Sequence, residues 1–210
     1  MKITWFGHAC FLIDHQGVRI LMDPFDSSVG YKVPNVSVDV VTESHQHFDH
    51  NAHHLLRGDF QLIKEAGEHT IKNVKIKGIK TFHDEAGGVK RGVNIVFVIE
   101  FSDFKVAHLG DLGHTLNQQQ VQQIGQLDVL LIPVGGTFTV GPEEAKKIVE
   151  QLQPHVAIPM HYKTKYIKFD LRPVEDFLKF FTNVKKFSES TIELGEEVKS
   201  QRVAIYVPSI

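Results

Sequence analysis

The sequence contains one cysteine and one tryptophan among its 210 residues. With Cys10 alone the chain cannot form an internal disulfide, and zinc sites built from thiolates lack their ligands. No apolar run approaches the roughly 20 residues that span a bilayer. The first residues are interrupted by Gly7 and His8 too early for a signal peptide. These absences favour a cytoplasmic protein without disulfides.

The sequence also lacks an excess of charge of either sign. It has 23 Lys and Arg against 25 Asp and Glu, which gives a formal net charge of -2. Nucleic-acid binding requires a clustered basic surface, whereas the basic residues here are spread along the chain. No linker or low-complexity tract divides the sequence. We therefore expect one domain over residues 1–210, with a small molecule as its partner and neither nucleic acid nor membrane.

Short apolar or alternating runs predict strands along most of the chain. They cover residues 2–6, 10–14, 18–22, 38–42, 74–82, 93–101, 104–109, 128–134, 156–160 and 203–207. Helices are expected at residues 118–124, 141–153 and 174–181, with a helical turn at 51–56. The strands fall into two groups, with helices mostly late in each group. This order predicts an α+β fold in which two sheets pack face to face with helices outside.

Histidine, in contrast, is abundant, with 13 residues. His45, His47, Asp49 and His50 supply four metal-binding side chains within six residues, directly after the predicted strand at 38–42. In an extended chain, residues i and i+2 point to the same side, so His45 and His47 can bind one ion together. Asp49 and His50 follow at a turn that can direct them elsewhere. The pattern therefore indicates two neighbouring cations.

Two metal sites need more ligands than this motif supplies. His83, Asp111 and His161 each follow a predicted strand, so one edge of a sandwich can gather all three. Asp111 lies in a Gly-Asp-Leu-Gly turn, and its carboxylate has two oxygens and a negative charge suited to bridging two cations.

Taken in this order, these motifs resemble the metallo-β-lactamase fold superfamily of metal-dependent hydrolases. Residues 5–10 (WFGHAC) and 21–24 (LMDP) resemble a branch of zinc-dependent hydrolases that is similar to L-ascorbate-6-phosphate lactonase. The resemblance implies a four-layer αββα sandwich with a dinuclear metal site. It also implies a ligand set: His45, His47 and His83 for the first ion, Asp49, His50 and His161 for the second, and Asp111 as the bridge.

The expected cofactors are two divalent ions, with Zn²⁺ as the first choice and Mn²⁺ or Fe²⁺ as alternatives. Such ions lower the pKa of bound water from about 15.7 towards about 7 and so provide hydroxide at neutral pH. The predicted function is hydrolysis of a small ester, lactone or phosphoester. The alternatives are a phosphodiesterase or nuclease of the same fold, which would need a basic insertion, and an iron-dependent oxidoreductase, for which no flavin-binding domain is present.

Three side chains are candidates for catalysis itself. Asp49 can accept a hydrogen bond from the nucleophile as well as bind metal. His8, beside Gly7 at a strand end, and His114, just after the Asp111 turn, are candidates for substrate contact or general acid catalysis. Each of these two histidines has the alternative of an ordinary turn residue. Asp23 is expected to position the metal-binding loops through hydrogen bonds.

Other residues have weaker assignments. His108, inside an apolar strand, is expected to be a core imidazole with a backbone partner, with support of the metal site as the alternative. Lys163 and Lys165, or the pair at 90–91, can receive an anionic group of the substrate, although a solvated surface is the simpler interpretation. The loop at 24–36 carries Phe25 and Tyr31 and is a candidate lid over the metal site.

Overall fold

The first apolar runs of the chain build a six-stranded sheet with the order β13-β1-β2-β3-β4-β5. The computed structural model describes all 210 residues. The strands of this sheet are β1 (Lys2–Gly7), β2 (Cys10–His15), β3 (Val18–Met22), β4 (Val40–Thr42), β5 (Gln61–Ile63) and β13 (Thr191–Glu193). Gln16 and Gly17 join β2 to β3 with φ angles of 51° and 74°, the left-handed conformation that tight hairpin turns require.

The later runs form an eight-stranded sheet with the order β12-β14-β11-β10-β9-β8-β7-β6. Its strands are β6 (Gly67–Ile71), β7 (Val74–Phe82), β8 (Val93–Glu100), β9 (Lys105–His108), β10 (Val129–Pro133), β11 (Val156–Met160), β12 (Val184–Lys186) and β14 (Ala204–Val207). Every residue of β10 and β11 is buried, because these parallel strands are covered on both faces.

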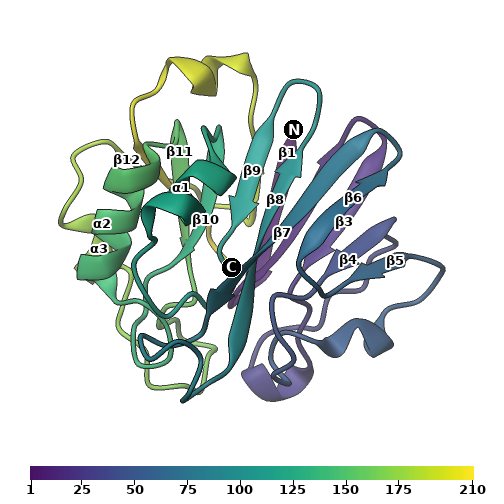
Figure 1. Cartoon of the computed structure of the whole chain (residues 1–210), viewed down its shortest axis with the longest axis horizontal. Helices are drawn as coiled ribbons and strands as arrows, with labels where there is room; N and C mark the ends of the chain where they lie inside the picture. Colours follow the sequence, from purple (N-terminus) through teal and green to yellow (C-terminus); the bar gives the residue numbers. More distant parts are fainter.

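Three α-helices lie on the side of the larger sheet that faces away from the smaller one (Figure 1). They are α1 (Gln118–Ile124), α2 (Pro142–Leu152) and α3 (Glu175–Leu178), and three short 3-10 helices are η1 (Ser27–Val29), η2 (Ala52–Leu55) and η3 (Glu196–Ser200). Asn117 and Gln120 cap α1 by a reciprocal capping box. None of these helices has the length and apolarity needed to cross a membrane.

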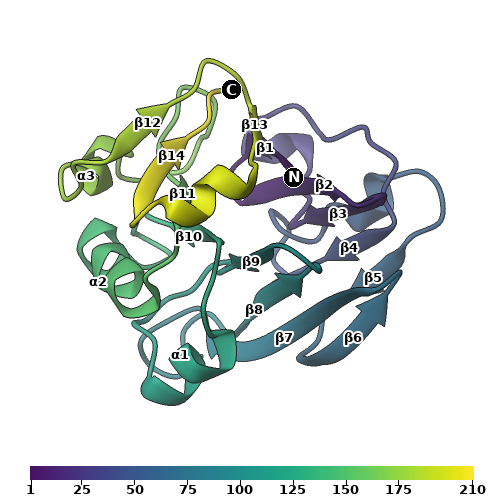
Figure 2. The same cartoon turned by 90° about the horizontal axis from the view of Figure 1, so that it is seen from above.

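Successive side chains of a strand point to opposite faces of the sheet, and in this way they contribute to two apolar clusters of unequal size. Phe11 and Ile13 of β2 belong to the main core of 52 buried residues, which includes residues of both sheets and of the helices. Cys10 and Leu12, of opposite parity, belong to a cluster of ten that includes Phe25 from the loop after β3. The outer layer of the smaller sheet is therefore made of loops and η1, and α-helices cover only the larger sheet (Figure 2).

The expected α+β sandwich is confirmed, and β3, β7, β11 and α1 have the predicted bounds. The strands not anticipated from sequence are β5, β6, β12 and β13, which are the four edge strands of the two sheets. Most side chains of β6 and β12 are exposed. The helix expected at 174–181 is shorter and covers only Glu175–Leu178.

Strand direction brings the ends of distant strands to one edge of the sandwich. In the smaller sheet, β1 and β3 are both antiparallel to β2, and β3 is parallel to β4, so all three end on the same side. In the larger sheet, β7 and β9 are both antiparallel to β8, and β9, β10 and β11 are parallel. His8, Asp23, His45, His83, Asp111 and His161 all follow these strands.

Close approach of two loops at this edge makes Gly135 a sensitive position. A Cβ atom on Gly135 would lie 2.1 Å from the backbone oxygen of His161. We expect Gly135→Ala to lower the free energy of unfolding by about 1–3 kcal/mol, the usual cost of overpacking. Thermal denaturation should show a drop in Tm of about 2–4 °C per kcal/mol for a chain of this size.

Gly141→Ala is the matched control, because its Cβ would meet only the ends of flexible side chains, the nearest at 3.2 Å. Equal Tm values for the two variants would show that the approach of Gly135 to His161 is not a constraint on the fold.

Candidate metal centre

Asp23, at the end of β3, holds the start of the histidine motif in place. Its carboxylate accepts hydrogen bonds from the backbone N of Ser44 at 2.7 Å and from Ser44 Oγ at 2.6 Å. Because the Ser44 hydroxyl donates to Asp23, it accepts from His45 Nδ1, at 2.9 Å. The Nδ1 proton of His45 is thereby fixed, and its Nε2 is left free to bind a ligand.

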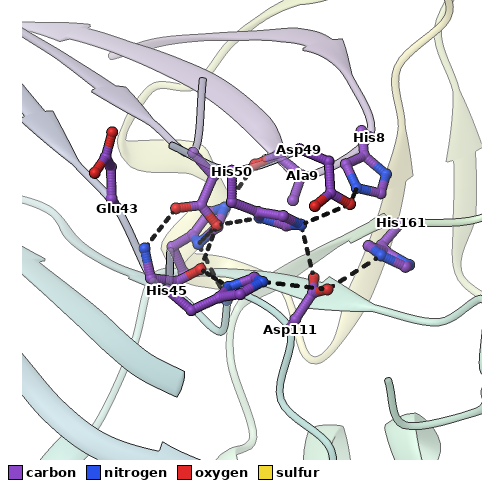
Figure 3. A network of polar contacts seen from close by, with 12 residues as sticks. His8, Ala9, Glu43, His45, Asp49, His50, Asp111 and His161 are labelled. Carbon is purple, nitrogen blue, oxygen red and sulfur yellow. Dashed lines mark hydrogen bonds and ion pairs between the residues drawn. The ribbon is translucent and has the colours of Figure 1, made fainter. Parts of the chain in front are cut away.

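The same carboxylate orients a second histidine of the motif. His50 is fully buried, and its Nδ1 donates to Asp23 Oδ2 at 2.8 Å. The opposite nitrogen, Nε2, lies 3.3 Å from Asp111 Oδ1 and 3.6 Å from Asp49 Oδ2. Figure 3 shows His50 between these two aspartates. Asp23 therefore orients both His45, through Ser44, and His50 by hydrogen bonds at their Nδ1 atoms.

Asp111 occupies the centre of the cluster because the turn after β9 is tightly fixed. Its backbone N donates to Asn94 Oδ1 at 2.9 Å, and the Asn94 amide donates to Leu109 O. The preceding Gly110 has a φ of 55°, and a Cβ there would lie 2.4 Å from Ser44 Cβ. These contacts hold the Asp111 carboxylate between the two sheets.

Histidines from separate strands converge on this carboxylate. Asp111 Oδ2 lies 3.2 Å from His83 Nε2, 3.3 Å from His161 Nε2 and 3.9 Å from His45 Nε2. The side chains form three overlapping groups whose ligand atoms lie within 4.8 Å of one another: His45, His47 and His83; His45, His50 and Asp111; and His8, Asp49, His50 and His161. The structure thus brings together all seven residues expected to bind metal.

His8 lies in the interior next to Asp49. Its side chain is fully buried, and Nε2 donates to Asp49 Oδ2 at 3.0 Å (Figure 3). Burial, together with the neighbouring His161, lowers the pKa of His8 to about 4. His8 is therefore neutral near pH 7 and orients Asp49. This placement differs from the expected substrate contact, because no atom of His8 reaches solvent.

Charge in the cluster is dominated by buried carboxylates. Asp23, Asp49 and Asp111 are all buried, and their ion pairs are with histidines only. Burial would raise the pKa of Asp49, but His50 and His8 outweigh it and hold that pKa below its ordinary value. Burial likewise opposes charge on His50, yet Asp111 and Asp49 raise the pKa of His50 well above its usual range. The site thus favours an added positive charge.

The donor set fits a divalent transition-metal ion. His45 Nε2, His50 Nε2 and Asp111 Oδ1 are buried and have no hydrogen-bond partner. Unpaired buried polar atoms are costly, and a cation at the cluster would satisfy all three. Imidazole nitrogens mixed with carboxylate oxygens suit zinc, manganese and iron.

A cavity of about 430 Å³ opens over the His and Asp cluster. Its lining includes the polar side chains His47, Asp49 and Asp111, together with Phe48, Phe138, Phe169 and Arg91. Sequence reasoning did not assign the three phenylalanines, Ser44 or Asn94 to the site. Proximity in sequence to His47 and His45 was a signal for Phe48 and Ser44, and Phe138 lies in the loop directly after the predicted strand at 128–134. Asn94 and Phe169 carry no such signal.

The remaining candidate histidines are held by main-chain groups. His114 Nε2 accepts from Phe82 N at 3.2 Å and Nδ1 donates to Thr115 O at 2.7 Å, so the structure does not bring His114 into the cluster. His108 Nε2 donates to Ala9 O at 2.7 Å, and Nδ1 accepts from Gly110 N at 3.1 Å. His108 is therefore a buried imidazole with backbone partners on both sides.

Of the expected anion receivers, Arg91 lines the cavity whereas Lys163 does not, and the expected lid also lies elsewhere. Lys163 Nζ donates to the backbone oxygens of Ile167 and Phe169, so it supports the 167–169 loop and does not line the cavity. Phe25 and Tyr31 are buried in the outer apolar cluster. The loop at 24–36 therefore packs on the smaller sheet, and its aromatic side chains do not cover the metal site.

A sandwich of two sheets with a His and Asp cluster at one edge is the arrangement expected from the resemblance to metallo-β-lactamase folds. The sequence profile of the β-lactamase superfamily domain matches residues 2–161. A UPF0173 metal-dependent hydrolase of Methanopyrus kandleri is 30% identical, and the match covers 95% of each chain. A UPF0173 protein of Pyrococcus abyssi is 33% identical over 78% of this chain and 84% of that one.

A solved structure from Thermotoga maritima, proposed to be a Zn-dependent hydrolase of the metallo-β-lactamase superfamily, is 52% identical. It superposes with a TM-score of 0.85 over 99% of both chains. A metallo hydrolase from Ignicoccus hospitalis is 23% identical with a TM-score of 0.67, a likeness of fold alone. The chain belongs to the metallo-β-lactamase superfamily, among its metal-dependent hydrolases.

Asp23→Asn tests the positioning of the two histidines. The amide keeps the shape of the side chain, but it is uncharged and its nitrogen cannot accept the bonds from Ser44 and His50. We expect a 10- to 100-fold loss of zinc affinity, roughly the effect of removing a partner that orients a metal ligand. Competition with a fluorescent chelator measures the affinity, and an unchanged value would remove Asp23 from this role.

Metal binding at neutral pH should release protons. The raised pKa of His50 keeps its ring protonated at pH 7 in the metal-free chain, whereas binding through Nε2 requires the neutral ring. Zinc titration calorimetry in buffers of different ionisation enthalpy should show release of at least about one proton per chain.

The sign of the pH dependence follows from the raised pKa. The contribution of His50 to proton release should be full below that pKa and disappear as the pH rises above it. Zinc binding at pH 7 without proton release would contradict the charge balance described for the site.

Proposed function

We propose that this protein is a two-metal hydrolase that acts on a small ester, lactone or phosphoester. The observation that carries the proposal is the central place of Asp111, whose carboxylate lies 3.2 Å from His83 of one histidine group and 3.3 Å from His50 and His161 of the other. His45, His47 and His83 would hold one ion, and Asp49, His50 and His161 the other. A single-ion site would leave one of these groups without a function.

Two such ions, when bound, supply a hydroxide at neutral pH and stabilise the developing oxyanion. Side chains of the protein supply the remaining roles. Asp49 stays anionic because its pKa is held low, and its Oδ2 is fixed by the hydrogen bond from His8 at 3.0 Å. Asp49 can therefore accept a hydrogen bond from the nucleophile at a defined position. His8 is a positioning residue that acts through Asp49.

Zinc is the proposed ion, with manganese and iron as alternatives for the same donors. Support comes from the zinc dependence ascribed to the 52% identical protein of Thermotoga maritima. Hydrolysis is favoured over an iron-dependent oxidation because the curated relatives are named metal-dependent hydrolases. A nuclease is disfavoured because Arg91 is the only lysine or arginine that lines the cavity, and a polynucleotide needs several phosphate contacts. The cytoplasmic location remains a prediction from sequence.

Metal content tests the proposal directly. Elemental analysis of protein purified without chelator should give about two ions per chain in the wild type. We expect His47→Ala to lose one ion and Asp111→Asn to lose most of both, because Asp111 contacts both groups. Hydrolysis of p-nitrophenyl acetate, bis-p-nitrophenyl phosphate and a γ-lactone should fall at least about 100-fold in both variants.

His54→Ala is the control, since His54 is an exposed histidine on η2 near the motif. It should retain both ions and full activity. Full metal content in His47→Ala and Asp111→Asn, or one ion in the wild type, would refute the two-metal site.

A further inference from the structure

Three phenylalanines from distant parts of the chain surround the cavity over the metal-binding residues, and we name them the aromatic collar: Phe48, Phe138 and Phe169. Phe169 lies between the other two, with ring centroids 6.3 Å from Phe48 and 6.1 Å from Phe138, both edge to face. Phe48 is 54% exposed and Phe138 37%. Large exposed apolar side chains that line one cavity are typical of a binding site for an apolar group.

Arg91 is the only lysine or arginine that lines this cavity. Its guanidinium stacks at 5.6 Å over the Phe138 ring, and Nη2 donates to Thr137 O at 3.2 Å. No carboxylate neutralises it, whereas Arg172 is paired with both Glu143 and Asp176. The guanidinium has five N–H donors, and one of them is used within the chain. Arg91 therefore offers an unpaired charge with free donors at a fixed position.

The loop that carries Arg91 is rigid because one carboxylate binds four of its amides. Asp84 Oδ1 accepts from the backbone N of Ala86 and Gly88, at 2.8 and 3.0 Å. Asp84 Oδ2 accepts from the backbone N of Lys90 and Arg91, at 2.9 and 2.7 Å. Asp84 directly follows His83, so the same segment supplies a metal-binding histidine and the charged side chain. Such a fixed placement reduces the entropy lost on binding.

We propose that Arg91 and the aromatic collar select substrates that combine an apolar body with one anionic group. The apolar body would lie against the collar, and the guanidinium would bind a carboxylate or phosphate of the substrate with two parallel hydrogen bonds. This inference rests on the proposed function, because it assigns a substrate class to the same cavity. It places the selecting charge on the loop after His83.

The anionic part of the proposal is tested by ligand binding to the zinc-loaded protein. Calorimetry would compare naphthalene-2-acetate with its neutral amide, naphthalene-2-acetamide. Arg91→Met should raise the Kd of the acetate about 10-fold or more, the size expected for a hydrogen bond to a charged group. The Kd of the amide should change by less than about 3-fold, because the amide lacks the charge.

Lys90→Met is the matched control. It removes the same charge from the neighbouring residue. Lys90 does not line this cavity, and its Nζ lies 3.6 Å from Glu85 Oε1. Equal effects of Arg91→Met and Lys90→Met on the acetate would mean that only long-range charge matters and would overturn the role of Arg91. So would equal affinity of the wild type for acetate and amide. Arg91→Lys keeps the charge without the planar fork and should retain only part of the preference.

The apolar part is tested by Phe48→Ala, with Leu55→Ala as the control because Leu55 is 44% exposed outside the cavity. Phe48→Ala should weaken both naphthalene ligands by about 5-fold or more and leave binding of plain acetate unchanged. An equal effect of the two variants would remove the collar from the binding site.

These measurements separate the inference from the proposed function, because binding is read without turnover. Two zinc ions per chain with no effect of Arg91→Met would leave the two-metal hydrolase standing and overturn the substrate class. Binding that depends on Arg91 in a protein that holds one ion would overturn the two-metal hydrolase and leave the substrate class standing.

Discussion

Three carboxylates buried at one edge of the sandwich, without lysine or arginine to neutralise them, are the constraint on which the site depends. Asp23, Asp49 and Asp111 pair only with histidines, and the unfavourable burial is offset when positive charge is present. Asp23 faces the rear of the cluster and fixes the rings of His45 and His50, whereas Asp49 and Asp111 face the space that a cation would fill. Metal binding and folding of these loops are therefore expected to be coupled.

The sandwich makes this arrangement possible through strand direction. Each side chain of the cluster sits just beyond a strand, and the pairing pattern makes those strands end at one edge. Close contacts then fix the loops against one another: Gly110 against Ser44, and Gly135 against the backbone of His161. The chemistry thus lies in short loops, while the 52-residue core holds their starting points in place.

Much of the site was predictable because the expected metal-binding residues follow apolar runs that are recognisable as strands. His45 to His50 form a local motif, and His83, Asp111 and His161 each end a run with clear β pattern. The edge strand β6 escaped prediction because its mostly exposed, polar residues resemble a loop, and β5 because it is only three residues long. The places of His8, His114 and Lys163 depend on which main-chain groups meet them in three dimensions. The convergence of Phe48, Phe138 and Phe169 depends in the same way on tertiary structure, so no local pattern reveals it.

The most direct test of the central claim is a crystal structure of the zinc-grown protein with anomalous diffraction recorded on both sides of the zinc absorption edge. The account predicts two anomalous peaks, one among His45, His47 and His83 and the other among Asp49, His50 and His161, with the Asp111 carboxylate between them. One peak in this cluster, or two peaks with Asp111 turned away from either, would contradict it.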